Sequence, residues 1–178
     1  MKSTILTVVG CTLLLPTISF GGDPYIDIHD TMCTEGEAIY ISCSFNANEK
    51  NKIKVASICA KGNESPDSGY IQYRYGIPGE KLELQFPKSI TSPKKIFKIY
   101  KSDSIDGITQ ALRFSKETYI YSFEKRGLSS YRLVVTENGK EVFNKSCEEP
   151  GKIYIADDAF DGIQTINLGE KEISNTDK

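Results

Sequence analysis

The chain has 178 residues, with 22 Lys or Arg against 24 Asp or Glu, and its formal net charge is −2 at pH 7. Charges of both signs are interspersed, as is ordinary for a soluble surface, and the basic stripe typical of nucleic-acid-binding proteins is missing. The length suffices for one domain with its own hydrophobic core. We therefore expect a single domain and no nucleic-acid partner.

The first 21 residues have the pattern of a signal peptide. A basic start at Lys2 is followed by an apolar run over residues 5–15 and by small residues that end at Gly21. This run is too short for a membrane-spanning helix, and no later segment repeats it. We expect residues 1–21 to be removed, which predicts a periplasmic or secreted protein with no membrane span. The alternative is a lipoprotein attached through Cys11, but the apolar run continues past that cysteine.

Four cysteines follow this segment, and an even number in an exported chain indicates two disulfides. Three pairings are possible. We favour Cys43 with Cys59, because they lie on two predicted strands that could be hairpin neighbours. This leaves Cys33 with Cys147, which would join the start of the domain to its end.

The chain offers little catalytic chemistry. Its one histidine, His29, has no spaced partner for a zinc site or a nucleophilic triad, and no C-x-x-C pair is present. Glycine-rich phosphate loops are also absent from the sequence, so we expect no catalytic residues, no metal and no cofactor. The remaining carboxylates are interpreted as solvated turn residues rather than as a calcium or hydrolytic site. They form two trios, which are Asp23, Asp27 and Asp30 near the start and Asp157, Asp158 and Asp161 near the end.

Short alternating segments separated by turn residues are typical of an all-β protein, and no window has a sustained helical period. Because antiparallel strands hide their edges by closure or by double layering, we expect an antiparallel β-barrel or β-sandwich of about eight to ten strands. This single domain would cover residues 22–168, with residues 169–178 as a flexible polar tail. The predicted strands are 38–45, 52–60, 70–75, 81–86, 96–101, 110–114, 117–123, 131–136 and 141–146, with a further one at 152–156.

The sharpest local signal is Asn138-Gly139, which stands between two alternating runs. These two residue types adopt the left-handed dihedrals that a type I′ hairpin turn requires. The pairing around this turn places Val135 opposite Val142 and Val134 opposite Phe143.

The most orderly hairpin lies between Ser65 and Pro87. A turn over residues 65–69 precedes one strand, and Ile77 to Glu80 reverses the chain. Because side chains alternate along a strand, Ile71, Tyr73 and Tyr75 share a face that suits the core. The opposite face would carry Tyr70, Gln72 and Arg74 toward solvent, with Arg74 paired to Glu83 when its role is purely structural.

This exposed loop on a rigid strand pair is the candidate recognition surface, since such loops commonly carry binding residues. Tyr and Arg are also the residue types that dominate interface energetics. The candidate binding residues are Asp67, Ser68, Gly69, Tyr70, Gln72 and Arg74.

Two other patterns have a structural interpretation, which we favour, beside a functional one. The basic cluster from Lys88 to Lys101 is interpreted as a solvated strand face with a lysine-protected edge, and otherwise as a ligand patch. Asn63-Glu64-Ser65 and Asn144-Lys145-Ser146 match the N-glycosylation pattern, which is common by chance and matters only for a eukaryotic source.

The segment from Ile41 to Pro87 resembles a group of small exported proteobacterial proteins, most of them uncharacterised. The resemblance rests on Ile58-Cys59-Ala60, on the run from Ser65 to Gly76 and on Leu82 to Pro87. More loosely, the size, signal, cysteines and β-content are similar to periplasmic lysozyme inhibitors, which insert a Ser-Gly-x-x-Tyr loop into the lysozyme cleft, and to periplasmic immunity proteins. In this chain Ser68-Gly69 is followed by Tyr70 and Tyr73.

This resemblance implies a non-enzymatic periplasmic protein whose protein partner is a lysozyme or another cell-wall-degrading effector. The alternative is an envelope module that binds a neighbouring protein or a glycan. A third hypothesis, hydrolysis by carboxylates, would depend on Asp161.

Overall fold

The computed structural model describes residues 30–46, 53–104, 107–149, 151–171 and 173. The predicted signal peptide and His29 lie outside these ranges, as do Asp23 and Asp27. Among the described residues, no helix has the length and apolar character needed to cross a membrane.

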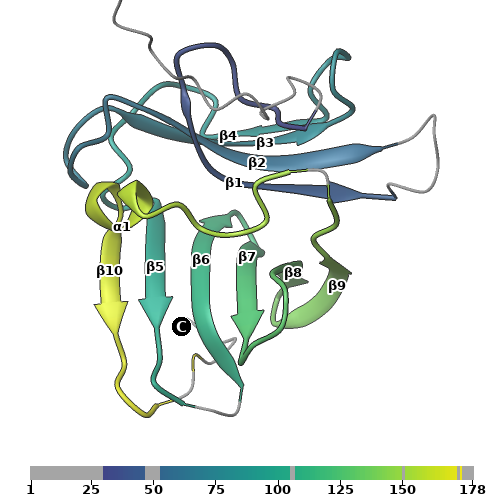
Figure 1. Cartoon of the computed structure of the whole chain (residues 1–178). Helices are drawn as coiled ribbons and strands as arrows, with labels where there is room; N and C mark the ends of the chain where they lie inside the picture. Colours follow the sequence, from purple (N-terminus) through teal and green to yellow (C-terminus); the bar gives the residue numbers. More distant parts are fainter. Residues whose placement is uncertain (1–29, 47–52, 105–106, 150, 172, 174–178) are drawn as a thin grey trace, which may run out of the picture.

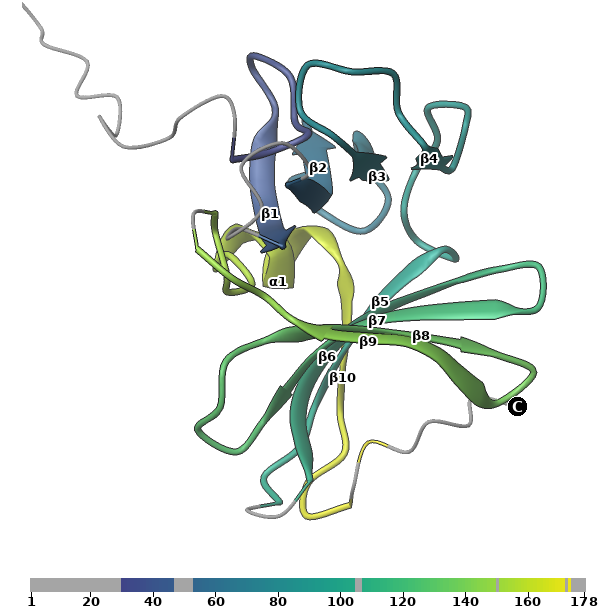
Figure 2. The same cartoon turned by 90° about the vertical axis from the view of Figure 1, so that its right-hand side faces the viewer.

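The strands form two sheets, which confirms the predicted all-β class (Figure 1). Within the described residues neither sheet closes on itself, so the architecture is a sandwich rather than a barrel. The four-stranded sheet packs over the six-stranded one, and the strands of the two sheets run across each other (Figures 1 and 2). The first sheet contains, in order, β1 (Ala38–Phe45), β2 (Lys54–Lys61), β3 (Tyr70–Gly76) and β4 (Leu84–Phe86). The second contains, in order, β10 (Gln164–Asn167), β5 (Phe97–Lys101), β6 (Ile108–Lys116), β7 (Tyr119–Arg126), β8 (Arg132–Glu137) and β9 (Lys140–Ser146).

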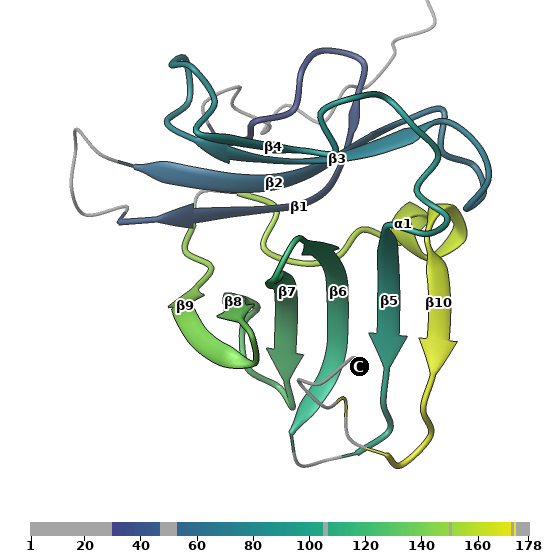
Figure 3. The same cartoon turned by 180° about the vertical axis from the view of Figure 1, so that it is seen from behind.

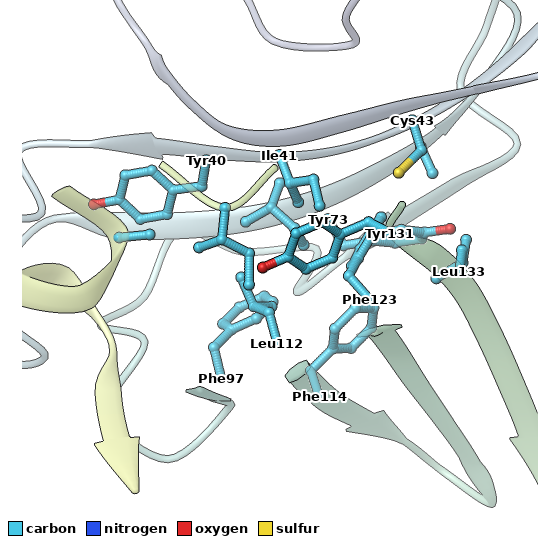
Figure 4. Close-up of a cluster of buried hydrophobic side chains, with 14 of the residues drawn as sticks. Tyr40, Ile41, Cys43, Tyr73, Phe97, Leu112, Phe114, Phe123, Tyr131 and Leu133 are labelled. Atoms are coloured by element: carbon cyan, nitrogen blue, oxygen red, sulfur yellow. The ribbon is translucent and has the colours of Figure 1, made fainter. Parts of the chain in front are cut away.

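One hydrophobic core draws side chains from both sheets (Figure 4). Its centre is Tyr73 on β3, whose ring lies 5.0 Å from that of Phe114 and 5.4 Å from that of Tyr121. Ile71 is also fully buried, so the predicted inward face of this strand is confirmed. Because side chains alternate along β3, this inward face of the four-stranded sheet packs against β6 and β7 of the other sheet.

The Asn138-Gly139 turn has positive φ at both residues, +50° and +78°, as predicted for a hairpin turn of this type. The predicted pairing is nevertheless wrong by one residue. Val135 stands opposite Phe143, because the register shifts at a bulge next to the turn. A bulge inserts one extra residue into one strand, and here that residue is Val142.

The two predicted disulfides are present, but the favoured pairing was wrong. The bonds join Cys33 to Cys59 and Cys43 to Cys147. Cys59 lies opposite Ile39 in the β1–β2 pair, several residues along the strands from Cys43. The two cysteines also face different sides of the sheet. Cys43 belongs to the core, as do Ile58 and Ala60, so Cys59, which lies between these two residues on β2, faces the opposite side.

The C-terminal part differs most from prediction. Residues 152–156 form no strand, but they run beside the edge of β1, where Ala156 donates its N–H to the Tyr40 carbonyl and Ser42 donates to that of Lys152. Helix α1 (Asp158–Gly162) and β10 follow at the sheet corner (Figures 1 and 3). Of the predicted tail, the structure describes residues 169–171 and 173. Ile173 is buried against Tyr100, Ile108 and Ala111.

Candidate functional site

The outward face of β3 is covered, so the predicted exposure of Gln72 and Arg74 was wrong. Gln72 is 3% exposed and Arg74 8% exposed. Residues 30–37 fold across this face, where the Cys33–Cys59 disulfide and a hydrogen bond from the Met32 N–H to the Ser57 hydroxyl hold them. The sequence of this segment has no strand pattern, and its covering role was therefore not predicted.

An ion pair between Glu37 and Arg74 lies under this segment. The Arg74 Nη1 and Nη2 atoms donate to the two carboxylate oxygens at 2.6 and 2.7 Å, and the Tyr70 hydroxyl donates to the carboxylate at 2.8 Å. Burial by itself would raise the pKa of Glu37, but hydrogen bonds from Arg74, Thr34 and Tyr70 outweigh it and lower the pKa to about 2. Glu83, the predicted partner of Arg74, instead pairs with Lys54 at 2.8 Å.

Gln72 belongs to the same network. Its Nε2 atom donates to the Pro87 carbonyl at 3.0 Å, and its Oε1 atom accepts from Arg74 at 2.8 Å. The polar groups of Tyr70, Gln72 and Arg74 therefore form hydrogen bonds within the domain. Of the predicted binding residues, Asp67, Ser68 and Gly69 remain in the loop at the surface.

The turn over residues 65–69 is held internally by Ser68. Its hydroxyl accepts the backbone N–H groups of Glu64 at 3.0 Å and Ser65 at 2.9 Å, and its own N–H donates to the Ser65 carbonyl. Gly69 has φ +60°, and a Cβ atom there would lie 2.2 Å from the Lys61 carbonyl oxygen. Only glycine fits this close approach, and the hydrogen bonds of Ser68 hold the turn in this conformation.

Asn63 joins this loop to helix α1, a role that the sequence did not reveal. Its Nδ2 atom lies within hydrogen-bond distance of the carbonyls of Ser65 (2.8 Å), Ser68 (2.9 Å) and Gly162 (2.9 Å). Its Oδ1 atom accepts from the Tyr40 hydroxyl at 2.8 Å. Asn63 is only 8% exposed and its amide is engaged, so its match to the glycosylation pattern has a structural explanation.

A cleft of about 390 Å³ lies between residues 62–64, which directly precede this loop, and α1. The exposed carboxylates of Glu64, Asp158 and Asp161 line it, and the aromatic side chain of Tyr40 forms part of its wall. Burial, and then the negative charges of Asp158 and Asp161, raise the pKa of Tyr40 to about 12, so that its hydroxyl stays protonated and keeps its hydrogen bond. The cleft is therefore acidic, and a hydrogen bond to Asn63 holds the Tyr40 side chain in its wall.

Asp67 stands at the tip of the loop and is exposed. It pairs with Lys94 at 2.8 Å, but more than half of each side chain is exposed, so this pair contributes little to stability. The Ser92 hydroxyl donates to the Pro66 carbonyl at 2.9 Å. The loop is thus braced on one side by residues 92–94 and on the other by Asn63.

The described residues bring three potential metal ligands together at Cys33, Glu37 and Cys59. Both sulfur atoms belong to the disulfide, so they offer no thiolate to a metal. Of the two predicted carboxylate trios, the first lies largely outside the described residues, while Asp157, Asp158 and Asp161 are exposed around α1.

No protein-family model, no curated protein and no solved structure matches this chain.

Proposed function

We propose that this chain is a non-enzymatic, extracytoplasmic binding protein that neutralises a cell-wall hydrolase or a similar toxin by capping its cleft. The recognition element is the loop of residues 64–69 together with the acidic cleft beside it. The observation that carries the proposal is that this exposed loop is fixed from within by Ser68 and from below by Asn63. A loop that is already ordered loses little conformational entropy on binding.

The charge of this surface favours a basic partner. Glu64, Asp67, Asp158 and Asp161 are exposed around the loop and the cleft, and of these Asp67 is paired with a lysine. Complementary charge speeds encounter and selects partners, more than it adds raw affinity. The two disulfides support an oxidising location, because such bonds persist outside the reducing cytosol.

The test is calorimetry of the exported protein with c-type and other lysozymes, and with effectors encoded beside its gene. We expect a complex that weakens roughly tenfold when both Glu64 and Asp67 are replaced by alanine. Glu117→Ala is the matched control, because this side chain is 72% exposed at a turn between β6 and β7. Absence of a complex with every one of these partners would refute the proposal.

The alternative of an envelope interaction module would use an edge of the six-stranded sheet. Strand β9 forms that edge, and most of its residues are exposed. However, it carries Lys140 and Lys145, and its pairing with β8 contains a bulge. These are features by which natural edge strands avoid pairing with other strands, so the loop is the better-supported recognition element.

A further inference from the structure

A second pocket, of about 200 Å³, is lined by residues from the end of β4, from the segment that leads into β5, and from β5 and β6. Its apolar wall includes Phe86, Ile96 and Phe114, and the Phe86 and Phe114 rings are stacked 5.4 Å apart. Among the described residues, the charged side chains that line it are those of Lys95, Lys98 and Arg113, and none of its described lining residues is acidic.

The pocket contains a cross-strand pair of like charges. Lys98 on β5 stands directly opposite Arg113 on β6, where like charges repel each other, and the Glu124 carboxylate on β7 pairs with Arg113 rather than with Lys98. Arg113 is directed toward β7, where its Nε atom donates to Ser122 at 3.0 Å and its Nη2 atom lies 3.4 Å from Glu124. The neighbour of Lys98 on its other side is Gln164, which brings no negative charge.

The lysines of the pocket differ from their neighbour in the same segment. Lys94 is paired with Asp67, whereas neither Lys95 nor Lys98 lies within ion-pair distance of a carboxylate in the part of the chain that is described. Two ammonium groups beside an apolar wall fit a carboxylate attached to an apolar body, because charge-assisted hydrogen bonds to a carboxylate are strong.

The pocket borders an edge strand of the four-stranded sheet. Phe86 is the last residue of β4, and β4 is an edge strand whose one neighbour among the described strands is β3. A peptide that adds to such an edge gains backbone hydrogen bonds and directs alternate side chains into adjacent pockets.

We propose that this pocket binds an acidic segment of a protein, with a Glu or Asp carboxylate between Lys95 and Lys98 and a neighbouring apolar side chain against Phe86 and Ile96. The site is separate from the loop and cleft assigned above. Its partner would be acidic, whereas the loop and cleft favour a basic partner. It also gives the basic cluster of residues 88–101 a binding role at two of its lysines.

The experiment is a titration of the ¹⁵N-labelled protein, followed through its amide spectrum, with the peptide acetyl-Val-Glu-Val-Gly-amide and with its Gln counterpart. We expect the Glu peptide to shift the amides of residues 84–86, 95–98 and 113–115 saturably, and the Gln peptide to bind roughly fivefold more weakly. Added NaCl should weaken the binding of the Glu peptide but not that of the Gln peptide. Lys98→Gln should lower its affinity by a similar factor, and Lys95→Gln provides the same test if the first variant does not fold.

Lys94→Gln is the matched control, because this neighbouring lysine is paired outside the pocket, and its affinity for the Glu peptide should match that of the unmodified protein. Equal affinity for the two peptides, no saturable shift, or no effect of either lysine substitution would overturn the proposal. Tighter binding of N-acetylmuramic acid than of the Glu peptide at the same residues would also overturn it, in favour of an acidic sugar.

Discussion

The carboxylate of Glu37 receives both terminal nitrogens of Arg74, at 2.6 and 2.7 Å, and its side chain is only 1% exposed. The two residues belong to different parts of the chain, since Glu37 ends the covering segment and Arg74 lies in the middle of β3. A buried charge that loses its partner is costly, so this pair couples the position of the covering segment to the sheet below it.

Acid should weaken the fold through Glu37. The pKa of this carboxyl is 4.5 ordinarily and about 2 in the folded protein, so the folded state binds fewer protons between these values. The free energy of unfolding should therefore have its full contribution from Glu37 above about pH 4.5 and lose about 3 kcal/mol as the pH falls to about 2. Urea unfolding between pH 7 and pH 2 measures this change.

Glu37→Gln should flatten the stability profile in that window and destabilise the protein at pH 7, because Arg74 then loses its counter-charge. Glu83→Gln is the control, since the Lys54–Glu83 pair is exposed and should contribute little. Parallel profiles for Glu37→Gln and the unmodified protein would contradict the assigned role of this carboxylate.

Asn63 should prove essential to the shape of the recognition loop. Asn63→Ala removes the bonds to the Tyr40 hydroxyl and to the loop carbonyls, and the buried groups left behind should cost about 2–3 kcal/mol of unfolding free energy. Hydrogen exchange at the Ser68 amide should accelerate as the loop loosens. Asn144→Ala is a control with the same glycosylation pattern at an exposed position, and an equal effect of the two substitutions would contradict this prediction.

Strand positions were largely predictable from the sequence because alternation is a local property. The strand from Ala38 to Phe45 was predicted with its observed bounds, and the Asn138-Gly139 turn was predicted with its dihedrals. The register beyond that turn was not, because a bulge next to it leaves no signal in the alternating pattern.

The candidate site was less predictable because it depends on contacts between distant segments. Residues 30–37 cover Arg74 because the Cys33–Cys59 bond ties them to the sheet. The order of the predicted strands did not identify this bond. Asn63 carried a sequence pattern that pointed to glycosylation, while its contact with Gly162 joins positions 99 residues apart. The fixed turn at Ser68 and Gly69, which uses local hydrogen bonds, was within reach of sequence reasoning.

One buried hydroxyl should be dispensable. Thr136 Oγ1 is buried and has no hydrogen-bond partner among the described residues, so Thr136→Val, which keeps the side-chain shape, should raise the free energy of unfolding by up to about 1 kcal/mol. Ser122→Ala on the adjacent strand should instead lower it by about 1 kcal/mol, because the Ser122 hydroxyl accepts from Arg113. Thermal unfolding of both variants tests this contrast, and destabilisation by Thr136→Val would show that the hydroxyl has a partner.

The two disulfides should contribute differently to the fold. The bonds close loops that differ in length, with sequence separations of 26 for Cys33–Cys59 and 104 for Cys43–Cys147. In the chain-entropy account, their removal by paired Ser substitutions costs about 3.5 and about 4.7 kcal/mol respectively. Chemical unfolding of the two double variants measures these losses.

The shorter bond should also control the acid response. Without Cys33–Cys59 the covering segment loses its tether, so the stability that Glu37 contributes above about pH 4.5 should shrink, whereas removal of Cys43–Cys147 should leave that pH dependence in place. Mass mapping under non-reducing conditions checks the pairing itself. A Cys43–Cys59 peptide would contradict the assigned bonds, and an unchanged acid profile in the Cys33→Ser, Cys59→Ser variant would show that Glu37 and Arg74 hold the segment without the disulfide.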